Sequence, residues 1–448
     1  MASEPVTLAD EATVGEAPQR PLALVQPAAR AGLDPAPVRD DAPSVGAVHR
    51  AAAAVARRLG RRVRHGQLRV EGVGGGWQAG EGSPSVRVTV HDGRTYWAVL
   101  RHGSEGLAES YIARWWDCDD LTGLTQLLLL NLATPIDVLD RIGERSSGAL
   151  SWWQRRRPPT AAADQANVRA HYDLPPRLFD LMLDETMSYS CAVFDGPEIK
   201  LADAQRAKLD RLCAKLGLGA DDHLLEIGTG WGGLAMHAAG NYGCRVTTTT
   251  ISAEQRGAAI ERVAAAGLDD RIEVLGLDYR QLTGTYDKLV SVEMIEAVDW
   301  RLHDEFFATC RRLLKDDGLM ALQAITIADR SYERAKHHDD FIRRMIFPGG
   351  CLPSVTAIAE SVKRASDLRI VDLDDIGRHY ATTLRRWYEN FNEHWDEIAA
   401  DGFDEQFHRL WDLYLCYCEG AFLERHISDV QIVLAAPRWR GPLAARGA

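Results

Sequence analysis

The stretch His223–Gly233, with the sequence HLLEIGTGWGG, combines the residue types of a ligand-binding turn. An apolar run ends at Ile227, and Gly228, Gly230 and Gly233 follow with the spacing G-x-G-x-x-G. Glycines at this spacing let backbone amides and the positive N-terminus of the next helix approach a nucleotide-like ligand. The alternative is an ordinary turn between a strand and a helix that binds nothing.

The residues around this turn favour a cationic adenosine ligand over a dinucleotide. A dinucleotide usually requires an acidic residue about 20 residues downstream, whereas the next predicted strand, CRVTTTTI, ends in threonines. The carboxylate of Glu226 and the indole of Trp231 suit a positive charge through Coulombic attraction and cation–π contact. These side chains predict S-adenosylmethionine, whose sulfonium carries such a charge.

Strands alternate with amphipathic segments from about residue 165, which is typical of an open, largely parallel α/β sheet. We predict strands over 224–227, 245–251, 272–275, 288–292 and 319–326. Ligands of such sheets lie over the carboxyl ends of the strands. Polar side chains recur at or just after these ends, which predicts a ligand site there: Glu226, Thr250, Ser252, Gln255, Asp278, Glu293 and Glu296.

Four regions are predicted along the chain. Residues 1–44 are rich in Ala, Pro and Asp and predict a disordered tail. Residues 45–145 predict a small α+β accessory domain, with strands over 68–70, 86–90 and 96–100 and helices from 110 to 141. Residues 146–165 predict a linker, and 166–448 form the α/β domain. The linker contains SWWQRRRPP, which suits either a membrane-headgroup anchor or packing of its tryptophans on a domain.

The composition sets limits on location and partners. A net charge of −12 argues against general nucleic-acid affinity. The eight cysteines form no C-x-x-C framework and no signal peptide precedes them, which predicts reduced thiols in a cytoplasmic protein. No metal site is predicted. The longest apolar run, at 127–130, is too short to span a bilayer, so membrane contact is expected to be peripheral.

A basic segment stands out in this acidic chain. No acidic residue lies between Asp41 and Glu71. We expect a helix over 49–64 with Ala52, Val55, Ala56 and Leu59 on one side and arginines on the other. Such a helix is either solvated or lies on an anionic membrane surface, and both readings stay open. The arginines of the interval are Arg50, Arg57, Arg58, Arg61, Arg62, Arg64 and Arg69.

Several ordered segments resemble the cyclopropane-fatty-acyl-phospholipid synthases, whose relatives include mycolic acid cyclopropane synthases and actinobacterial unsaturated-fatty-acid methyltransferases. The resemblance covers about 165–435 densely, and WWDCDD at 115–120 extends it into the accessory domain. Besides the glycine turn, the segments are HYDL at 171–174, MSYSCAVF at 187–194, SVEMIEAV at 291–298, FPGGCLPS at 347–354, HYATTL at 379–384 and CEGAF at 418–422.

The resemblance implies a class I (Rossmann-like) methyltransferase domain that uses S-adenosylmethionine. Its substrate would be the cis double bond of unsaturated acyl chains in membrane phospholipids, reached from the inner membrane face. By position, cofactor contacts carry over to Tyr189, Ser190, Glu226, Gly228, Gly230, Gly232, Thr250, Ser252, Gln255, Asp278 and Tyr279.

The resemblance also implies a bound bicarbonate ion that acts as the base, held by residues corresponding to Cys191, Glu296, Ile325 and Tyr380. Better-known bacterial members have a histidine where this chain has Gln323, and an amide can hydrogen-bond an anion but cannot titrate near neutrality. Cys418 corresponds to a cysteine proposed as catalytic in the family. Its structural reading, a small residue in a packed helix, is the favoured one.

The chemistry requires a site that stabilises positive charge and then removes one proton. Attack of an alkene on the sulfonium methyl creates a carbocation, which aromatic faces and a carboxylate stabilise where water is excluded. The anion would accept hydrogen bonds from the Tyr380 hydroxyl, the Gln323 amide, the backbone near Ile325 and the Cys191 thiol. Glu296 is expected to share a proton with it. The expected aromatic residues are Tyr172, Tyr189, Phe194 and Trp231.

Two products diverge only after the cation forms. Loss of a proton from the added methyl closes a cyclopropane ring, which is the predicted product. Loss from the chain carbon leaves a 10-methylene branch, which a separate reductase would turn into a 10-methyl branch. An inactive lipid-binding homologue and a small-molecule methyltransferase are the further alternatives, and a homodimer is among the assemblies left open.

Overall fold

The computed structural model describes residues 46–131, 174–196, 198–337 and 340–442. The predicted tail over 1–44, the predicted linker over 146–165 and Tyr172 lie outside the described residues. None of the helices in the described ranges is long and apolar enough to cross a bilayer.

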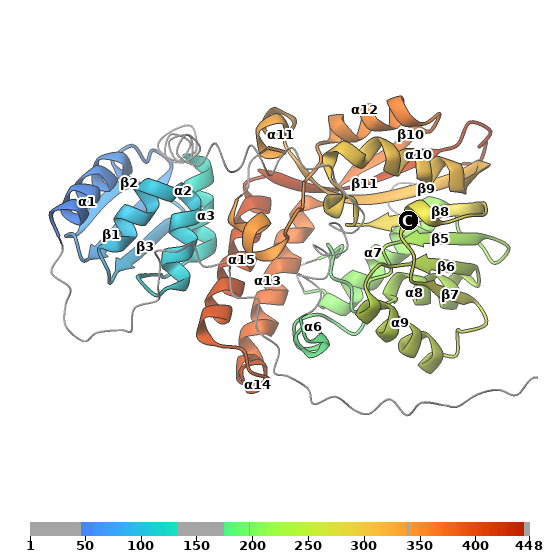
Figure 1. Ribbon diagram of the computed structural model, residues 1–448, viewed down its shortest axis with the longest axis horizontal. Helices are drawn as coiled ribbons and strands as arrows, with labels where there is room; N and C mark the ends of the chain where they lie inside the picture. Colours follow the sequence, from blue (N-terminus) through green and yellow to red (C-terminus); the bar gives the residue numbers. More distant parts are fainter. Residues whose placement is uncertain (1–45, 132–173, 197, 338–339, 443–448) are drawn as a thin grey trace, which may run out of the picture. The chain divides into compact units, whose positions relative to one another are not determined.

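A seven-stranded sheet forms the centre of the α/β domain, in the order β10-β11-β9-β8-β5-β6-β7 (Figure 1). The five strands from β9 to β7 run parallel, whereas β11 is antiparallel to both of its neighbours. The largely parallel α/β fold is therefore confirmed. The strands are β5 (His223–Ile227), β6 (Arg245–Thr249), β7 (Ile272–Leu275), β8 (Tyr286–Val292), β9 (Leu314–Ile327), β10 (Arg369–Asp375) and β11 (Ile427–Ala435).

Helices cover both faces of this sheet, so each strand buries residues on two sides. Within β5, Leu225 packs in one apolar cluster with α10 and α12, and Leu224 packs in another with α7 and α8. The main helices are α7 (Leu201–Leu216), α8 (Gly233–Tyr242), α9 (Ala253–Ala265), α10 (His303–Leu313), α12 (Val355–Ala365), α13 (Gly377–Glu393) and α15 (Glu405–Leu423). Shorter helices are α6 (Pro176–Met182), α11 (Asp329–Ala335) and α14 (Trp395–Ala400).

The accessory unit contains a four-stranded sheet in the order β2-β1-β3-β4. Its strands are β1 (Gly66–Gly72), β2 (Trp77–Glu81), β3 (Ser85–Val90) and β4 (Trp116–Cys118), and its helices are α1 (Ala47–Gly60), α2 (Arg94–Ile112) and α3 (Leu121–Leu130). The predicted strand over 96–100 is wrong, because these residues belong to α2. A short apolar run fits either period, and here Thr95 and Ala98 are buried one helical turn apart.

Two further expectations for this unit need correction. The helical stretch expected from 110 to 141 is interrupted, because β4 lies between α2 and α3. In α1, the buried side is formed by Ala52 and Ala53, and Val55 is 45% exposed rather than part of that side. The small alanines allow α1 to pack closely on the domain, which leaves its valines on the outer face.

Candidate active site

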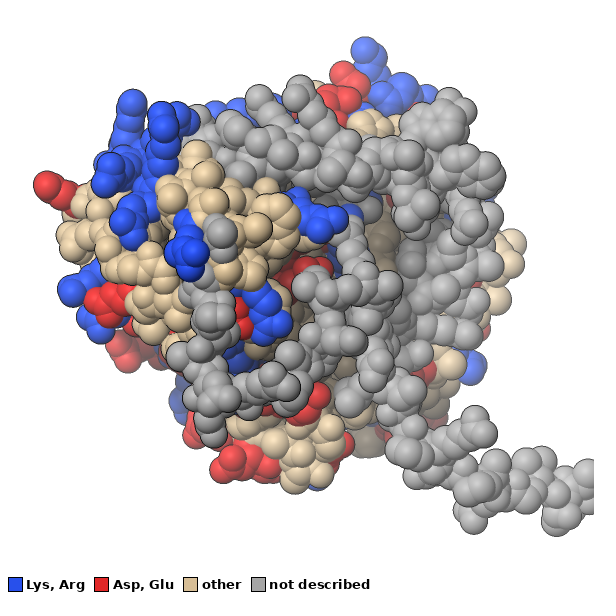
Figure 2. All heavy atoms as spheres, turned by 60° about the vertical axis from the view of Figure 1, so that its left-hand side comes forward, with Lys and Arg blue, Asp and Glu red and all other residues tan. Residues whose placement is uncertain are grey.

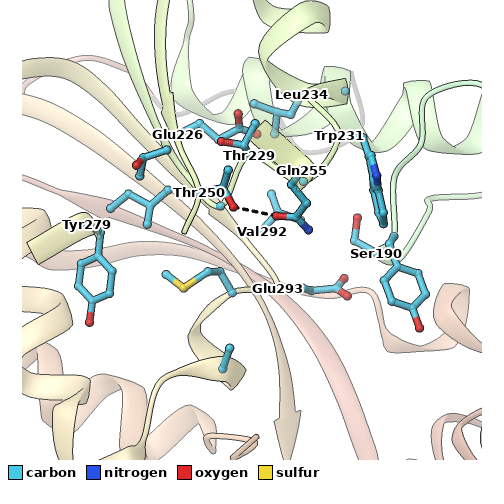
Figure 3. Close-up of a pocket in the computed structure, with 18 of the residues that line it drawn as sticks. Ser190, Glu226, Thr229, Trp231, Leu234, Thr250, Gln255, Tyr279, Val292 and Glu293 are labelled. Carbon is cyan, nitrogen blue, oxygen red and sulfur yellow. Dashed lines mark hydrogen bonds between the residues drawn. The ribbon is translucent and has the colours of Figure 1, made fainter. Parts of the chain in front are cut away.

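A pocket lies over the carboxyl ends of β5, β6 and β8 and the loops that follow them (Figure 3). Nine of the eleven residues predicted to contact the cofactor line it. The other two have structural positions: Ser252 caps α9 by accepting a hydrogen bond from the Gln255 amide at 3.2 Å, and Gly232 caps α8. The nine are Tyr189, Ser190, Glu226, Gly228, Gly230, Thr250, Gln255, Asp278 and Tyr279.

The glycine turn is held by its backbone. The amides of Gly228 and Thr229 both donate to the Thr249 carbonyl, at 3.0 and 3.2 Å, which ties the turn to β6. Gly230 has a φ of 51°, and a Cβ added to it would meet no atom within 4 Å. At Gly233 there is no room for a side chain, because an added Cβ would lie 2.4 Å from the Thr186 carbonyl oxygen. The turn therefore needs glycine for conformation at one end and for close packing at the other.

Helices α7 and α9 position the loops on either side of the pocket. Gln205 donates to the carbonyls of Ser188 and Ser190, at 3.2 and 2.8 Å, and Lys208 donates to the Ser190 hydroxyl at 2.9 Å. Arg262 donates to the Trp231 carbonyl at 2.7 Å. The loop that carries Tyr189 is thus fixed by two buried polar side chains that the sequence did not single out.

The carboxyl group of Glu226 is buried and hydrogen-bonded to a threonine hydroxyl group. It accepts a hydrogen bond from the Thr248 hydroxyl at 2.6 Å, and Thr248 in turn bonds the Thr229 hydroxyl at 2.7 Å. Burial raises the pKa of Glu226 to about 8 despite the bond from Thr248. Burial thus favours the neutral acid at Glu226, and the contact of its carboxyl group with a cationic donor stays a prediction.

Other polar groups at the strand ends are preorganised by short-range bonds. Thr250 donates to Gln255 at 2.8 Å, as the dashed line in Figure 3 shows. Asp278 accepts a two-pronged interaction from Arg280, with the Nη2–Oδ2 distance at 2.6 Å. Burial opposes the ionised form, but the bonds from Arg280 prevail and lower the pKa of Asp278. The far end of the pocket therefore holds a charged carboxylate that is already paired.

Aromatic rings connect the glycine turn to the second half of the site. Phe179 lies 4.7 Å from Trp231 and 5.4 Å from Tyr189, measured between ring centroids. Trp387 lies 5.0 Å from Tyr189 and 5.9 Å from Tyr380. Such rings exclude water and present negative potential at their faces. Phe194 packs at the edge of the same apolar cluster.

The second half of the site centres on Glu293, which follows β8 and lines the pocket. Its Oε1 accepts hydrogen bonds from the Cys191 amide and from Gln323 Nε2, both at 2.8 Å. Its Oε2 accepts from the Tyr380 hydroxyl at 2.6 Å. The three donors come from the loop between α6 and α7, from β9 and from α13. Sequence reasoning noted Glu293 only as one of several polar residues at strand ends.

Two more carboxyl groups lie next to Glu293. Glu296 Oε1 accepts from the Ile325 amide, and its Oε2 has no hydrogen-bond partner within the described part of the chain. Asp429 Oδ2 accepts from Gln323 Nε2 at 3.0 Å. Burial, reinforced by the neighbouring Glu293, raises the pKa of Glu296 to about 8 and that of Asp429 well above its ordinary value. Asp429 was missed because β11 carries no recognisable motif.

The donors expected to hold bicarbonate do not fit a separate anion. The Cys191 amide, Gln323 and Tyr380 all donate to Glu293, and the Ile325 amide donates to Glu296. The Cys191 thiol, expected to donate to the anion, donates instead to the Ala192 carbonyl at 3.2 Å in this structure. The chain's own carboxyl groups thus occupy the positions predicted for the ion.

Cys418 is the expected catalytic residue that the structure keeps apart from this group. It lies on α15, packs against the large aromatic cluster and does not line the pocket. Burial raises the pKa of its thiol, which disfavours the nucleophilic thiolate. These observations agree with the structural reading of Cys418.

The amino-acid sequence is similar to those of known lipid-modifying methyltransferases and synthases. Residues 160–432 match the family model described as mycolic acid cyclopropane synthetase. The chain is 41% identical to tuberculostearic acid methyltransferase UfaA1 of Mycobacterium tuberculosis over 351 residues, 75% of this chain and 80% of that protein. It is 38% identical to the cyclopropane-fatty-acyl-phospholipid synthase of Escherichia coli K12 over 368 residues, 82% of this chain and 92% of that protein.

Solved structures of methyltransferases are also similar to this chain. The mycolic acid cyclopropane synthase CmaA1 complexed with SAH and CTAB superposes with a TM-score of 0.56 and 32% identity, covering 60% of this chain and 98% of that chain. Coclaurine N-methyltransferase bound to N-methylheliamine and SAH has a TM-score of 0.54 at 19% identity and shares the fold alone.

Proposed function

This chain belongs to the mycolic acid cyclopropane synthetase family and is an S-adenosylmethionine-dependent methyltransferase, and on that premise we propose that it methylates the cis double bond of unsaturated acyl chains in membrane phospholipids. One observation carries the proposal. Glu293 lines the pocket of the methyl donor and is also held by the residues of the second half of the site. A methyl donor bound in this pocket would therefore face the carboxyl group of Glu293.

The residues present suit the donor. S-adenosylmethionine, when bound, supplies an electrophilic methyl group. The backbone of the glycine turn would hold its amino acid part, and Thr250, Gln255 and Asp278 offer hydrogen-bonding groups for the adenosine. Trp231 and Tyr189 also line the pocket, and their ring faces would favour the positive charge of the sulfonium.

The aromatic wall stabilises the charge that develops on the acyl chain. As the double bond attacks the methyl group, one alkene carbon becomes cationic. Tyr189 lines the pocket and packs on Trp387, which in turn packs on Tyr380. An apolar wall of this kind would exclude water and strengthen the electrostatic interactions beside it. Removal of one proton then completes the reaction.

We propose a cyclopropane as the product, with proton loss from the newly added methyl. A methylene branch is the second candidate, and the observation that favours it is the presence of Gln323 at the family's histidine position, together with the identity to a tuberculostearic acid methyltransferase. A separate reductase would then be needed to saturate the branch. Both candidates use the same pocket and differ only in which C–H bond is broken.

Lipid analysis of a host that expresses this chain and makes neither product tests the proposal. Both products add one CH2 and are isomers, so mass spectrometry must be combined with NMR, where ring protons and exomethylene protons differ in shift. Ring signals support the proposal, and exomethylene signals support the second candidate. An unchanged lipid profile, with the purified protein still binding phospholipid, would instead indicate an inactive lipid-binding homologue.

We also propose that α1 contacts the anionic surface of the membrane. Its outer face carries Val48 and Val55, which are 58% and 45% exposed, beside the exposed Arg58, Arg61 and Arg62. Figure 2 shows Lys and Arg gathered on one part of the surface of this unit. Guanidinium groups bind lipid phosphates while small apolar side chains enter the headgroup region.

The triple variant Arg58→Gln, Arg61→Gln, Arg62→Gln tests this contact. Each arginine near an anionic surface contributes about 1 kcal/mol, so vesicle binding is expected to weaken by about 100-fold and to lose much of its salt dependence. Arg57 is kept, because it donates to the Gly74 carbonyl at 3.0 Å. The charge-matched control is Arg245→Gln, Arg330→Gln, Arg369→Gln in the α/β domain. Equal binding of both triple variants would reject α1 as the contact.

A further inference from the structure

We infer that Glu293 is the base that removes the proton from the methylated acyl chain, in the place that a bicarbonate ion would take. The inference rests on the proposed function and deepens it, because it names the group that completes the reaction. It also explains why the donors expected for the ion are already engaged.

The first support is the hydrogen-bond geometry. The donors from Cys191, Gln323 and Tyr380 converge on the two oxygens of one carboxylate, at 2.8, 2.8 and 2.6 Å. A planar carboxylate has the same two-oxygen geometry as one edge of bicarbonate. Oε1 accepts two bonds and Oε2 accepts one, so a lone pair on Oε2 stays open to receive a proton.

The second support is the backbone of Glu293. Its φ is 48°, in the left-handed region that a residue with a side chain adopts at a cost of about 1–2 kcal/mol. Such strain persists where the surrounding structure enforces it, and it occurs preferentially at functional sites. Here the left-handed conformation accompanies a side chain that reaches the pocket and three donors at once.

The third support is the distribution of charge among the neighbouring groups. Burial, and after it the neighbouring Glu293, raises the pKa of Glu296 and of Asp429, which favours their neutral forms. Burial also raises the pKa of Glu293, but bonds from Tyr380, the Cys191 amide and Gln323 oppose that rise. The buried Lys208 adds a favourable charge. The three hydrogen bonds to Glu293 therefore favour its ionised form, whereas the surroundings of Glu296 and Asp429 favour the neutral acid.

The step balances without a further reactant. The alkene electrons form the new carbon–carbon bond, and the sulfur–methyl bond breaks with its electron pair left on sulfur. Glu293 Oε2 then takes a proton from the cationic chain. The electrons of the broken C–H bond close the ring or form the exomethylene bond. Glu293 ends as a neutral acid and returns its proton to water when the product leaves.

Two measurements on the full chain test this. Wild-type activity on unsaturated phospholipid vesicles is compared in bicarbonate-free and bicarbonate-containing buffer, and no difference is expected. Glu293→Gln keeps the size of the side chain but cannot accept the proton, so kcat is expected to fall by about 100-fold or more, with no recovery in bicarbonate. Binding of S-adenosylhomocysteine, which has no sulfonium charge, should persist and shows that the pocket is intact. Glu360→Gln, at an exposed position of α12, is the matched control.

Glu293→Gly sharpens the test, because glycine tolerates this φ and frees the three donors and the side-chain volume. This variant is expected to be inactive in bicarbonate-free buffer and to recover by about tenfold or more when bicarbonate is added. Full activity of Glu293→Gln would overturn the inference, and so would dependence of the wild type on bicarbonate. An active wild type that fails these tests leaves the proposed function standing, whereas an inactive wild type removes both.

Discussion

The two halves of the pocket are built in different ways. The half for the methyl donor is made mostly of neighbouring residues and backbone groups, with the turn Gly228–Gly233 tied to β6 by amides. The half around Glu293 is made of groups from five separated segments: a backbone amide from the loop at Cys191, and side chains from the end of β8, from β9, from α13 and from β11. The first half is specified by local conformation, and the second is specified by tertiary structure.

This difference predicts two kinds of failure. A substitution in the turn acts through space and backbone conformation, so it should remove donor binding. A substitution around Glu293 acts through charge and proton affinity, so it should leave donor binding intact and slow the reaction. A variant that violates this division would show that the two halves do not act separately.

Gly230→Asp is expected to have the largest effect. The turn needs a φ of 51° at this position, and an added side chain would project into the open space of the pocket. An aspartate there fills the space of the donor and repels its carboxylate, so calorimetry should detect no S-adenosylhomocysteine binding and turnover should be lost.

Gly217→Asp is the matched control for this substitution. Gly217 ends α7 with a φ of 58° and also has no atom within 4 Å of an added Cβ, but it is exposed and lies outside the pocket. Both variants therefore carry similar backbone strain. Equal loss of binding in the two variants would attribute the effect to strain and contradict the assigned turn.

The same division explains how much could be predicted from the sequence. The alternation of strands and helices and the glycine spacing are local signals, and they predicted the positions of the five parallel strands and most of the residues that line the pocket. Strands β10 and β11 and the position of Asp429 depend on antiparallel pairing between distant segments, for which no local signal exists. Asp429, for example, pairs with Ile325 of β9. Glu293 shows the limit best, because its position after a strand was visible but its three partners were not.

Tyr380→Phe is expected to have an intermediate effect. The hydroxyl donates to Glu293 at 2.6 Å, and a hydrogen bond to a charged group contributes about 1.5–3 kcal/mol. We expect kcat to fall by about 10- to 100-fold with donor affinity unchanged. Because the lost bond favours the ionised form, the pKa of Glu293 should rise, and the acid limb of the pH–rate profile should move to higher pH.

Tyr388→Phe is the control for this effect, since Tyr388 lies on the same helix and contacts Arg385 rather than Glu293. Its pH profile should match that of the wild type. If Tyr380→Phe lowers kcat without moving the acid limb, the hydroxyl positions another group and does not act on Glu293.

The smallest effects are expected on stability, from one glutamate in each half. Burial raises the pKa of both Glu226 and Glu296 from an ordinary 4.5 to about 8. The folded state therefore binds these protons more tightly than the unfolded chain, and the resulting stabilisation is fully present below pH 4.5 and is lost as the pH rises towards 8. Glutamine cannot ionise, so Glu226→Gln and Glu296→Gln should each reduce the fall in Tm that differential scanning calorimetry detects between about pH 5 and about pH 8.5. This range covers most of the interval between the ordinary and the raised pKa of the two glutamates. Glu360→Gln should leave that fall unchanged.

If the two halves are independent, the double variant Glu226→Gln, Glu296→Gln should show the sum of the two single effects on this fall in Tm, because the effects of separate sites add. A smaller combined effect would mean that the carboxyl groups of the two halves share their electrostatic environment, and it would weaken the separation between donor binding and proton removal on which the other two experiments depend.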